Sequence, residues 1–327
     1  MRFDVAILGA GPAGCAAALA LLREGCSVAI VEGTPFPRHR PGETLSPGIE
    51  PVLASLGAES AVLEGTPLRF AATCVTWGGR AAVVPYGADE QGPWCGFQVS
   101  REDLDSRLLR HAVSQGAVLI EGRPLDLLVA RERVAGLKTM QGDLHADWTL
   151  DATGRARWLM RRLGVEVSIR SPRLHARYGY AAVDADYPVL PHLRADSTGW
   201  TWTAKVGNHR ALWLRVTEAS LTSQRRWTPP HLIGKHEPAV RAADVTWSTA
   251  SHLFGAGWLL CGDAAGQLDP SSGHGVLRAA MSGVMAARAV SRGALGSYAD
   301  WFRDSYEHDA GQMAANYREA RLFGHAA

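Results

Sequence analysis

The sequence predicts an α/β protein in which a mainly parallel-sheet domain is interrupted by a mostly antiparallel β domain and followed by a C-terminal helix. Three observations support this fold class. Residues 5–8 form a short apolar run that ends in Gly9 and leads into an Ala- and Leu-rich helical stretch. Between residues 167 and 252, short stretches alternate apolar and polar side chains, as half-buried antiparallel strands do. Residues 258–261 return to an uninterrupted apolar run, and helical patterns follow.

The first half of the chain predicts alternating strands and helices. Pro12 suits the first turn of a helix, and Gly25 is placed to end it. Ser100 and the acidic residues after it have the pattern of a capping box, which predicts a helix to about residue 114. The expected elements are strands at 5–8, 27–31, 117–121 and 148–150, helices at 12–23 and 101–114, and a hairpin at 125–130 and 133–139.

The second half adds antiparallel strands at about 177–183, 199–206 and 211–216, and helices at about 275–291 and 298–320. A chain of 327 residues is long for one core, so we expect two closely joined lobes. One discontinuous domain takes residues 1–71, 97–166 and 254–291, and the inserted β domain takes 72–96 and 167–253. Residues 292–327 form a C-terminal helical segment.

The bulk composition excludes several classes of function. The net charge is +2 and no Lys/Arg stripe occurs, so we expect no nucleic-acid partner. No apolar stretch reaches 18 residues, and the N-terminus lacks the apolar segment of a signal peptide, so we expect no membrane insertion. Five scattered cysteines without a CxxC pair predict free thiols, no metal site and a cytoplasmic location.

A glycine-rich turn between the first strand and the first helix is the first motif with a chemical meaning. It runs Gly9-Ala10-Gly11-Pro12-Ala13-Gly14, with Glu32 and Gly33 at the end of the next strand. The three glycines allow a tight turn, close approach of a pyrophosphate, and close packing of helix on sheet. The helix N-terminus attracts the phosphate charge, and the acid can accept hydrogen bonds from a ribose. The motif therefore predicts dinucleotide binding.

A late motif specifies the dinucleotide. Gly262 and Asp263 follow the apolar run at 258–261, and Pro270, Gly273 and Gly275 open the next helix just before Val276. With these motifs the chain resembles the FAD-dependent hydroxylase superfamily, which includes flavin-dependent halogenases and geranylgeranyl reductases. The resemblance implies a glutathione-reductase-type, Rossmann-like FAD-binding domain, with the Gly-Asp pair on the ribityl chain and the P-x-x-G-x-G turn along the isoalloxazine ring.

Three weaker matches extend the resemblance across the first lobe. Arg40 and Glu43 fall in a segment that resembles the one running from the adenosine site toward the flavin. Arg101 resembles an arginine that contacts FAD, and Asp151 begins a turn typical of the halogenase and reductase branches. The DG motif of single-component hydroxylases is missing at that turn. FAD is therefore expected to be reduced by NAD(P)H directly or through a separate flavin reductase.

The inserted domain is rich in tryptophan, which suits a flat aromatic substrate. Trp200 and Trp202 lie in a segment that resembles the WxWxIP motif of halogenases, and on a strand they share one face. They are either walls of a substrate site or ordinary core residues. Halogenases depend on a lysine in the first substrate-side segment, whereas this chain has no lysine before Lys138, and Lys205 lies in another strand. The sequence therefore favours hydroxylation over halogenation.

Within the superfamily, the 269–283 stretch looks most similar to LodB/GoxB-type flavoproteins, which modify a tryptophan of a partner protein during quinone-cofactor formation. The resemblance implies a monooxygenase that hydroxylates an aromatic small molecule or a partner-protein tryptophan through a flavin C4a-hydroperoxide. His274 and Glu43 are candidate acid/base groups, and either could instead have a structural role. The alternatives are a halogenase-like enzyme, a geranylgeranyl-reductase-like alkene reductase, and a non-catalytic FAD-binding protein.

Overall fold

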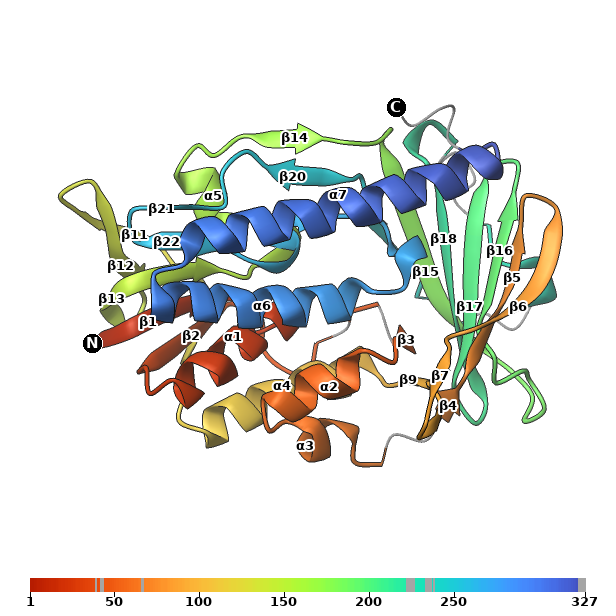
Figure 1. The fold of residues 1–327 in the computed structure, drawn as a ribbon, viewed down its shortest axis with the longest axis horizontal. Helices are drawn as coiled ribbons and strands as arrows, with labels where there is room; N and C mark the ends of the chain where they lie inside the picture. Colours follow the sequence, from red (N-terminus) through yellow and green to blue (C-terminus); the bar gives the residue numbers. More distant parts are fainter. Residues whose placement is uncertain are drawn as a thin grey trace.

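The computed structural model of this chain describes residues 1–38, 40–41, 44–65, 68–221, 227–232, 237 and 239–322. Two lobes lie side by side, and the C-terminal helix runs along both (Figure 1). The mixed α/β fold confirms the predicted fold class, including the helix at the C-terminus.

The first lobe is built on an eight-stranded sheet with the path β10-β2-β1-β13-β12-β11, to which β22 and β21 are added beside β13. Strands β10, β2, β1, β13 and β22 run parallel, and β11 and β12 form the predicted antiparallel hairpin. The strands are β1 (Arg2–Leu8), β2 (Val28–Glu32), β10 (Val118–Glu121), β11 (Asp126–Ala130), β12 (Arg133–Thr139), β13 (Gly142–Asp151), β21 (Phe254–Gly255) and β22 (Trp258–Leu260).

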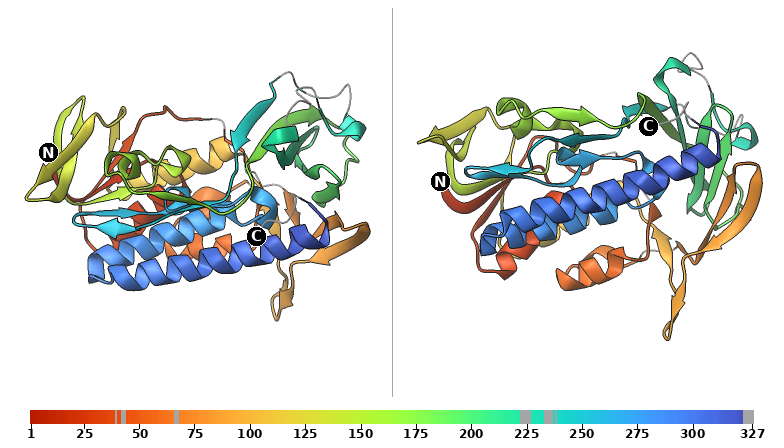
Figure 2. Two further views of the ribbon diagram at one scale, coloured as in Figure 1. Left: turned by 90° about the horizontal axis from the view of Figure 1, so that it is seen from above. Right: turned by 45° about the horizontal axis from the view of Figure 1, so that its top comes forward.

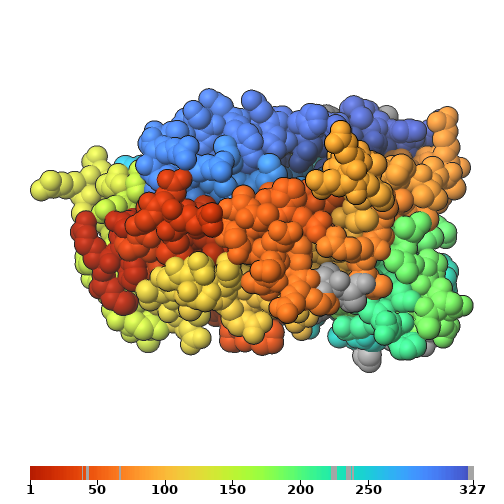
Figure 3. Space-filling view, turned by 60° about the horizontal axis from the view of Figure 1, so that its bottom comes forward, coloured from red at the N-terminus to blue at the C-terminus, as the bar shows by residue number. Residues whose placement is uncertain are grey.

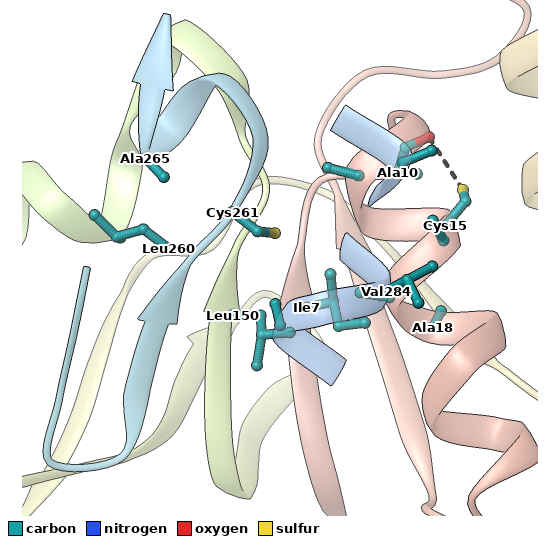
Figure 4. Packing of buried hydrophobic residues seen from close by; sticks show 14 of the residues in the cluster. Ile7, Ala10, Cys15, Ala18, Leu150, Leu260, Cys261, Ala265 and Val284 are labelled. Atoms are coloured by element: carbon teal, nitrogen blue, oxygen red, sulfur yellow. Dashed lines mark hydrogen bonds between the residues drawn. The ribbon is translucent and has the colours of Figure 1, made fainter. Parts of the chain in front are cut away.

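Helices α1 (Pro12–Arg23) and α6 (Gly275–Arg292) pack against this sheet and against each other. A Cβ atom on Gly283 of α6 would lie 2.1 Å from the carbonyl oxygen of Ala13, so the helices cross at a distance that only glycine permits. Figure 4 shows Ile7 and Leu150 of the sheet facing Ala18 and Val284 of the two helices, with Leu260 on the opposite side of the sheet. The N-termini of α1 and α6 are thereby held near one another.

Smaller elements complete the first lobe. They are helices α2 (Ile49–Ser55), α3 (Glu59–Leu63), α4 (Arg101–Ser114) and α5 (Trp158–Arg162), a sheet of β3 (Thr44–Leu45), β9 (Gly96–Gln98) and β4 (Leu68–Phe70), and a sheet of β14 (Val167–Ile169), β20 (Ser248–Ala250) and β23 (Gly266–Gln267). Helix α4 begins where the capping box predicted, but the capping itself was wrong, because the Ser100 side chain makes no cap hydrogen bond.

The second lobe is a seven-stranded, mostly antiparallel sheet with the order β19-β15-β18-β17-β16-β5-β6. Its strands are β5 (Ala72–Trp77), β6 (Arg80–Pro85), β15 (Leu174–Ala182), β16 (His192–Asp196), β17 (Gly199–Gly207), β18 (Arg210–Glu218) and β19 (Arg241–Asp244), and β7 (Ala88–Asp89) and β8 (Gly92–Pro93) form a separate hairpin. Among the described strand pairs of this sheet, β16–β5 alone is parallel. The predicted boundary at 167 is the first residue of β14, and the boundary at 253 comes shortly after β20, the strand that pairs with β14, so the domain division stays a prediction.

Helix α7 (Leu295–Glu319) joins the two lobes. Both views in Figure 2 show it running beside α6 and then reaching the seven-stranded sheet. At its far end the Trp77 indole donates a hydrogen bond to the carbonyl oxygen of Asn316 at 2.7 Å. In the space-filling view the end of α7 meets the β5–β6 segment at the surface (Figure 3). Within the described residues, no helix combines the length and apolarity needed to span a bilayer.

Candidate functional site

The glycine-rich turn lies between the end of β1 and the N-terminus of α1. Gly9 has φ +96, and a Cβ atom there would lie 2.6 Å from the carbonyl oxygen of Ala152. A Cβ atom on Gly14 would lie 1.9 Å from the Gly9 oxygen. At Gly11 the nearest atom to such a Cβ is the end of the Arg38 side chain, at 3.4 Å. Two glycines therefore serve packing, and the third leaves one side of the turn open to a ligand.

Helix α1 begins with Pro12 and Ala13, and no side chain caps its N-terminus. The Glu32 carboxylate holds the turn from the side: it accepts hydrogen bonds from the Ala10 backbone at 2.9 Å and from the Thr34 backbone at 2.8 Å. Gly33 follows at the surface against Arg123. The structure thus brings these predicted residues into one cradle with free backbone donors at a helix N-terminus.

Arg38 is a residue of this cradle that the sequence interpretation missed. Its Nη1 donates to Glu32 Oε2 at 2.8 Å, its Nη2 lies 3.6 Å from Asp105, and its buried Nε has no hydrogen-bond partner in the part of the chain that the structure describes. The sequence shows Arg38 as a second arginine two positions before Arg40. Its position next to Gly11 depends on the fold and could not be read from the sequence.

Arg38 belongs to a group of four arginines on this side of the first lobe, which are Arg38, Arg40, Arg101 and Arg155. Burial, and then the positive charges of the other three, lower the pKa of the Arg40 guanidinium. Like charges held this close destabilise one another and favour a bound anion. Arg101 is occupied within the protein, because it pairs with the buried Asp105 at 3.0 Å and donates to the carbonyl oxygen of Pro41 at 3.1 Å.

Asp151 has a structural role. One carboxylate oxygen accepts from the backbone and hydroxyl of Thr153, and the other accepts from the backbone of Leu159 at 2.9 Å and of Met160 at 3.4 Å. The side chain is fully buried, and burial raises the pKa of its carboxyl. It therefore holds the turn that packs on Gly9 from behind, and the prediction of a direct cofactor contact gains no support from its side chain.

Gly262 and Asp263 follow β22 and lie next to α1. Gly262 has φ +61, a Cβ atom there would lie 2.9 Å from the Ala13 side chain, and its backbone donates to Ser282 Oγ at 2.7 Å. Asp263 is half-buried, and its negative charge opposes the lowering of the Arg157 pKa that burial causes. The structure thus places the late Gly-Asp pair at the same helix N-terminus as the glycine-rich turn.

The segment from Pro270 to Val276 forms the predicted turn into α6. Asp269 caps a short 3₁₀ turn by accepting from the Ser271 backbone at 2.9 Å, and Gly273 follows with φ +68. The side chain of the N-cap residue, His274, makes no capping hydrogen bond to α6. A Cβ atom on Gly273 or Gly275 would meet no atom of the described residues within 4 Å, so the outer side of the turn is open toward them.

A buried polar cluster, which the sequence did not reveal, supports this turn from behind. Asp269 Oδ2 accepts a hydrogen bond from the Tyr317 hydroxyl at 2.7 Å and from the Trp247 indole at 2.6 Å. The Tyr317 hydroxyl also lies 3.0 Å from Ser271 Oγ and accepts from the Trp200 indole at 2.9 Å. Burial raises the pKa of the Asp269 carboxyl, and these donors oppose the shift. Helix α7 and the seven-stranded sheet are therefore both tied to the turn.

A cavity of about 330 Å³ lies beside the turn, between α7 and the face of the seven-stranded sheet that packs toward it. It is lined by Val75, Trp77, Leu193, Ser271, Ser272, His274, Asp309, Gln312, Met313 and Asn316. His274, a predicted acid/base group, thus lies between the open turn and the cavity. His274 is exposed as a whole, but the protein atoms around its imidazole displace water and lower its pKa, Arg278 adds to this, and Asp309 opposes it.

The two predicted tryptophans have different surroundings. Trp200 is fully buried against Tyr317, so its interpretation as a pocket wall was wrong and it is a core residue. Trp202 is half-buried and donates to Thr44 Oγ1 at 3.3 Å, and its cross-strand partner Leu193 lines the cavity. Glu43, the other predicted acid/base group, lies outside the described residues.

The residues present fit FAD on three independent observations. The turn at Gly11 and the 273–275 turn each have an open side. A loop that binds a ligand through its backbone atoms needs such an open side. Arg38 Nε, Ser46 Oγ and Gln98 Nε2 are buried and have no partner among the described residues. Four arginines share one side of the lobe. A bound anionic cofactor accepts hydrogen bonds from unpaired donors and offsets the repulsion between neighbouring arginines.

Comparisons with known proteins agree with an FAD cofactor. A family model for FAD-dependent oxidoreductases matches residues 4–177, more than half of the 327 residues. The tryptophan 2-halogenase of Chondromyces crocatus is 26% identical over 88% of this chain and 60% of its own length. A pyrrole-2-carbonyl peptidyl-carrier-protein brominase of Pseudoalteromonas luteoviolacea is 25% identical over 94% of this chain and 81% of its own.

A solved structure extends the fold comparison to a different activity. PqsL, a probable FAD-dependent monooxygenase from Pseudomonas aeruginosa, superposes with a TM-score of 0.82 at 17% identity and covers 97% of this chain and 96% of its own. That likeness concerns the fold. This chain spans less than two thirds of the tryptophan 2-halogenase, so the activity of that whole protein does not transfer with the match.

Proposed function

Because this chain belongs to the FAD-dependent oxidoreductase family, we propose that it is an FAD-dependent monooxygenase that hydroxylates a flat aromatic ring. The observation that carries the proposal is the cavity of about 330 Å³, which adjoins the open 273–275 turn and has His274 at its border. Its volume is at the small end of the range for ligand pockets, about 300–1,000 Å³. A single ring system with a short substituent fits such a volume.

The cofactor would be held by the cradle residues already described: the backbone of 11–14 and Arg38 at the pyrophosphate, Glu32 at the ribose, Asp263 at the ribityl chain, and the backbone of 273–276 at the ring. FAD, when bound and reduced, supplies the electrons that activate dioxygen. The open N-terminus of α6 places positive backbone charge beside the ring position.

The chain's own residues then position the substrate and move a proton. Val75, Leu193 and Met313 exclude water from the ring. His274 accepts the proton that leaves the ring carbon after an oxygen atom is added, and its lowered pKa keeps the imidazole neutral and ready to accept. Ser271 and Ser272 also line this cavity and add polar groups beside a substituent of the ring.

A halogenase is the second candidate, and the tryptophan 2-halogenase and the carrier-protein brominase favour it. The position of Lys205 disfavours it. Successive side chains of a strand alternate, so Lys205 lies on the opposite face of β17 from Trp202, and its buried ammonium donates to the carbonyl oxygen of Ala185. Lys138 lies on β12 in the first lobe, and Lys235 falls outside the described residues.

The identity of the ring is part of the proposal. A ring carried by a partner protein is a substrate to test beside free aromatics, since the brominase relative is named for a carrier-protein-bound pyrrole. The narrower resemblance to the tryptophan-modifying LodB/GoxB-type flavoproteins stays a prediction that depends on short motifs. The source of electrons, NAD(P)H or a flavin reductase, is likewise to be tested.

The discriminating experiment supplies the purified holoprotein with chemically reduced flavin, air and a panel of indoles and phenols, with and without chloride or bromide. We expect products heavier by one oxygen atom, formed equally with and without halide. Products that contain halogen and require it would replace this proposal with the halogenase. Turnover of an alkene under anaerobic conditions would favour the reductase branch instead.

A further inference from the structure

Building on the proposed function, we infer that the cavity accepts aromatic rings that are uncharged or positively charged and excludes anionic ones, and that Asp309 of α7 makes this selection. The described residues that line the cavity come from β5, β16, the turn before α6, and α7. The two ionisable side chains among them are Asp309 of α7 and His274 of the turn. The inference names a substrate class for the site without depending on which oxidation occurs there.

The apolar part of the cavity is lined by Val75, Trp77, Leu193 and Met313. Trp77 is fixed on one side, because its indole donates to the carbonyl oxygen of Asn316 at 2.7 Å and its ring stacks on Tyr317 with centroids 5.8 Å apart. Met313, on the same helix as Asn316, supplies a polarizable side chain to the lining. Such surfaces favour a flat ring over a branched aliphatic chain.

The charges of the lining have one sign. Asp309 is an acid, and among the described residues that line the cavity there is neither lysine nor arginine. His274 has a lowered pKa and is neutral at pH 7. Arg278 lies 3.6 Å from Asp309 but is not part of the lining, so it reduces the negative charge of the cavity without presenting a cation to a ligand.

A ligand that carries a carboxylate next to its ring would therefore lose hydration and gain no cationic partner. An amine gains the attraction of Asp309, and a neutral N–H ring can donate to the same carboxylate or to the side chains of Gln312 and Ser272. The substrates that fit are amines, neutral heteroaromatics, and aromatic residues within a peptide or on a carrier, where no free carboxylate lies beside the ring.

The test uses one ring with three charges. Tryptamine, indole and indole-3-acetate are titrated into the FAD-loaded protein at pH 7, with calorimetry or the perturbation of the flavin spectrum as the readout. We expect tryptamine to bind at least about tenfold more tightly than indole-3-acetate, with indole between them. In Asp309→Asn the affinities for tryptamine and indole should differ by no more than about threefold. The affinity for indole-3-acetate should increase, because Arg278 then loses its counter-charge.

Asp300→Asn is the matched control. Asp300 lies on the same helix, is highly exposed, pairs with Arg303 at 3.2 Å and is not among the described residues that line the cavity. This variant should leave all three affinities unchanged. Indole-3-acetate that binds as tightly as tryptamine, or a preference that Asp309→Asn leaves intact, would overturn the inference. So would the absence of binding by all three probes.

Failure of this inference is distinguishable from failure of the proposed function. If the charge preference holds but no oxygen-containing product forms from any ligand, the cavity selects as inferred and the monooxygenase proposal is wrong. If indole-3-acetate is hydroxylated as readily as tryptamine, the monooxygenase proposal stands and Asp309 does not select.

Discussion

Replacing Tyr317 with phenylalanine removes one oxygen atom from the buried polar cluster behind the 270–275 turn. The hydroxyl group donates to Asp269 at 2.7 Å and accepts from Trp200 at 2.9 Å, and both partners are at most 2% exposed. Leaving a buried donor or acceptor unsatisfied costs about 1–3 kcal/mol. The variant removes one partner from Asp269 and one from the Trp200 indole, while Asp269 keeps its bonds from Trp247 and from the Ser271 backbone. We therefore expect a total loss of about 2–4 kcal/mol in the free energy of unfolding.

The loss should depend on pH. Burial raises the pKa of Asp269 in the folded state, and the Tyr317 hydroxyl is one of the groups that lower it. Removing that hydroxyl raises the folded-state pKa further. A carboxyl whose pKa is raised on folding costs stability as the pH rises above its ordinary value of about 4. The destabilisation by Tyr317→Phe should therefore be larger at pH 8 than at pH 5.

Urea denaturation of both proteins at the two pH values measures this difference. Tyr298→Phe is the matched control, since Tyr298 is also a buried tyrosine of α7 but donates to a backbone carbonyl, that of Leu260, at 2.7 Å. It should cost about 1 kcal/mol at both pH values. A loss for Tyr317→Phe that is no greater than the control, or that is equal at pH 5 and pH 8, would refute the role assigned to the Asp269 cluster.

Three further predictions follow from single residues. Gly14→Ala should abolish retention of FAD through dialysis, since its Cβ would lie 1.9 Å from the Gly9 oxygen. A Cβ on Gly311 meets no described atom within 4 Å, so Gly311→Ala should retain FAD and stabilise α7 by about 0.5–1 kcal/mol in urea denaturation. The turnover rate should rise as the His274 imidazole deprotonates at a pH below its ordinary value of about 6.5, and His274→Gln should lower the rate and remove this step from the pH–rate profile. Lys205→Met should keep full turnover, because the ammonium faces away from the cavity; loss of product at unchanged FAD content would contradict that placement.

The cofactor cradle could be predicted from the sequence because each part of it is local. The glycines at 9, 11 and 14, the acid at the end of the next strand, and the turn into α6 are all set by neighbours within a few residues. Positions that require a positive φ, such as 9 and 273, are occupied by glycine, so the sequence itself indicates them. The same reasoning located most helices and strands of both lobes.

The substrate side could not be predicted in this way, because it depends on contacts between distant segments. The Asp269–Tyr317 bond joins residues 48 apart, and Trp77 of β5 meets Asn316 across 239. Strand alternation correctly placed Trp200 and Trp202 on one face, but it does not say what covers that face. Helix α7 covers Trp200 with Tyr317, which turns a predicted pocket wall into core.

The origin of the oxygen atom in the product tests the central claim most directly. The holoprotein, with reduced flavin and an indole substrate, is supplied with isotopically labelled dioxygen, and the product is weighed by mass spectrometry. The account predicts one labelled oxygen atom per product molecule, with no requirement for halide. A product that carries oxygen from water, or halogen in place of oxygen, would contradict it.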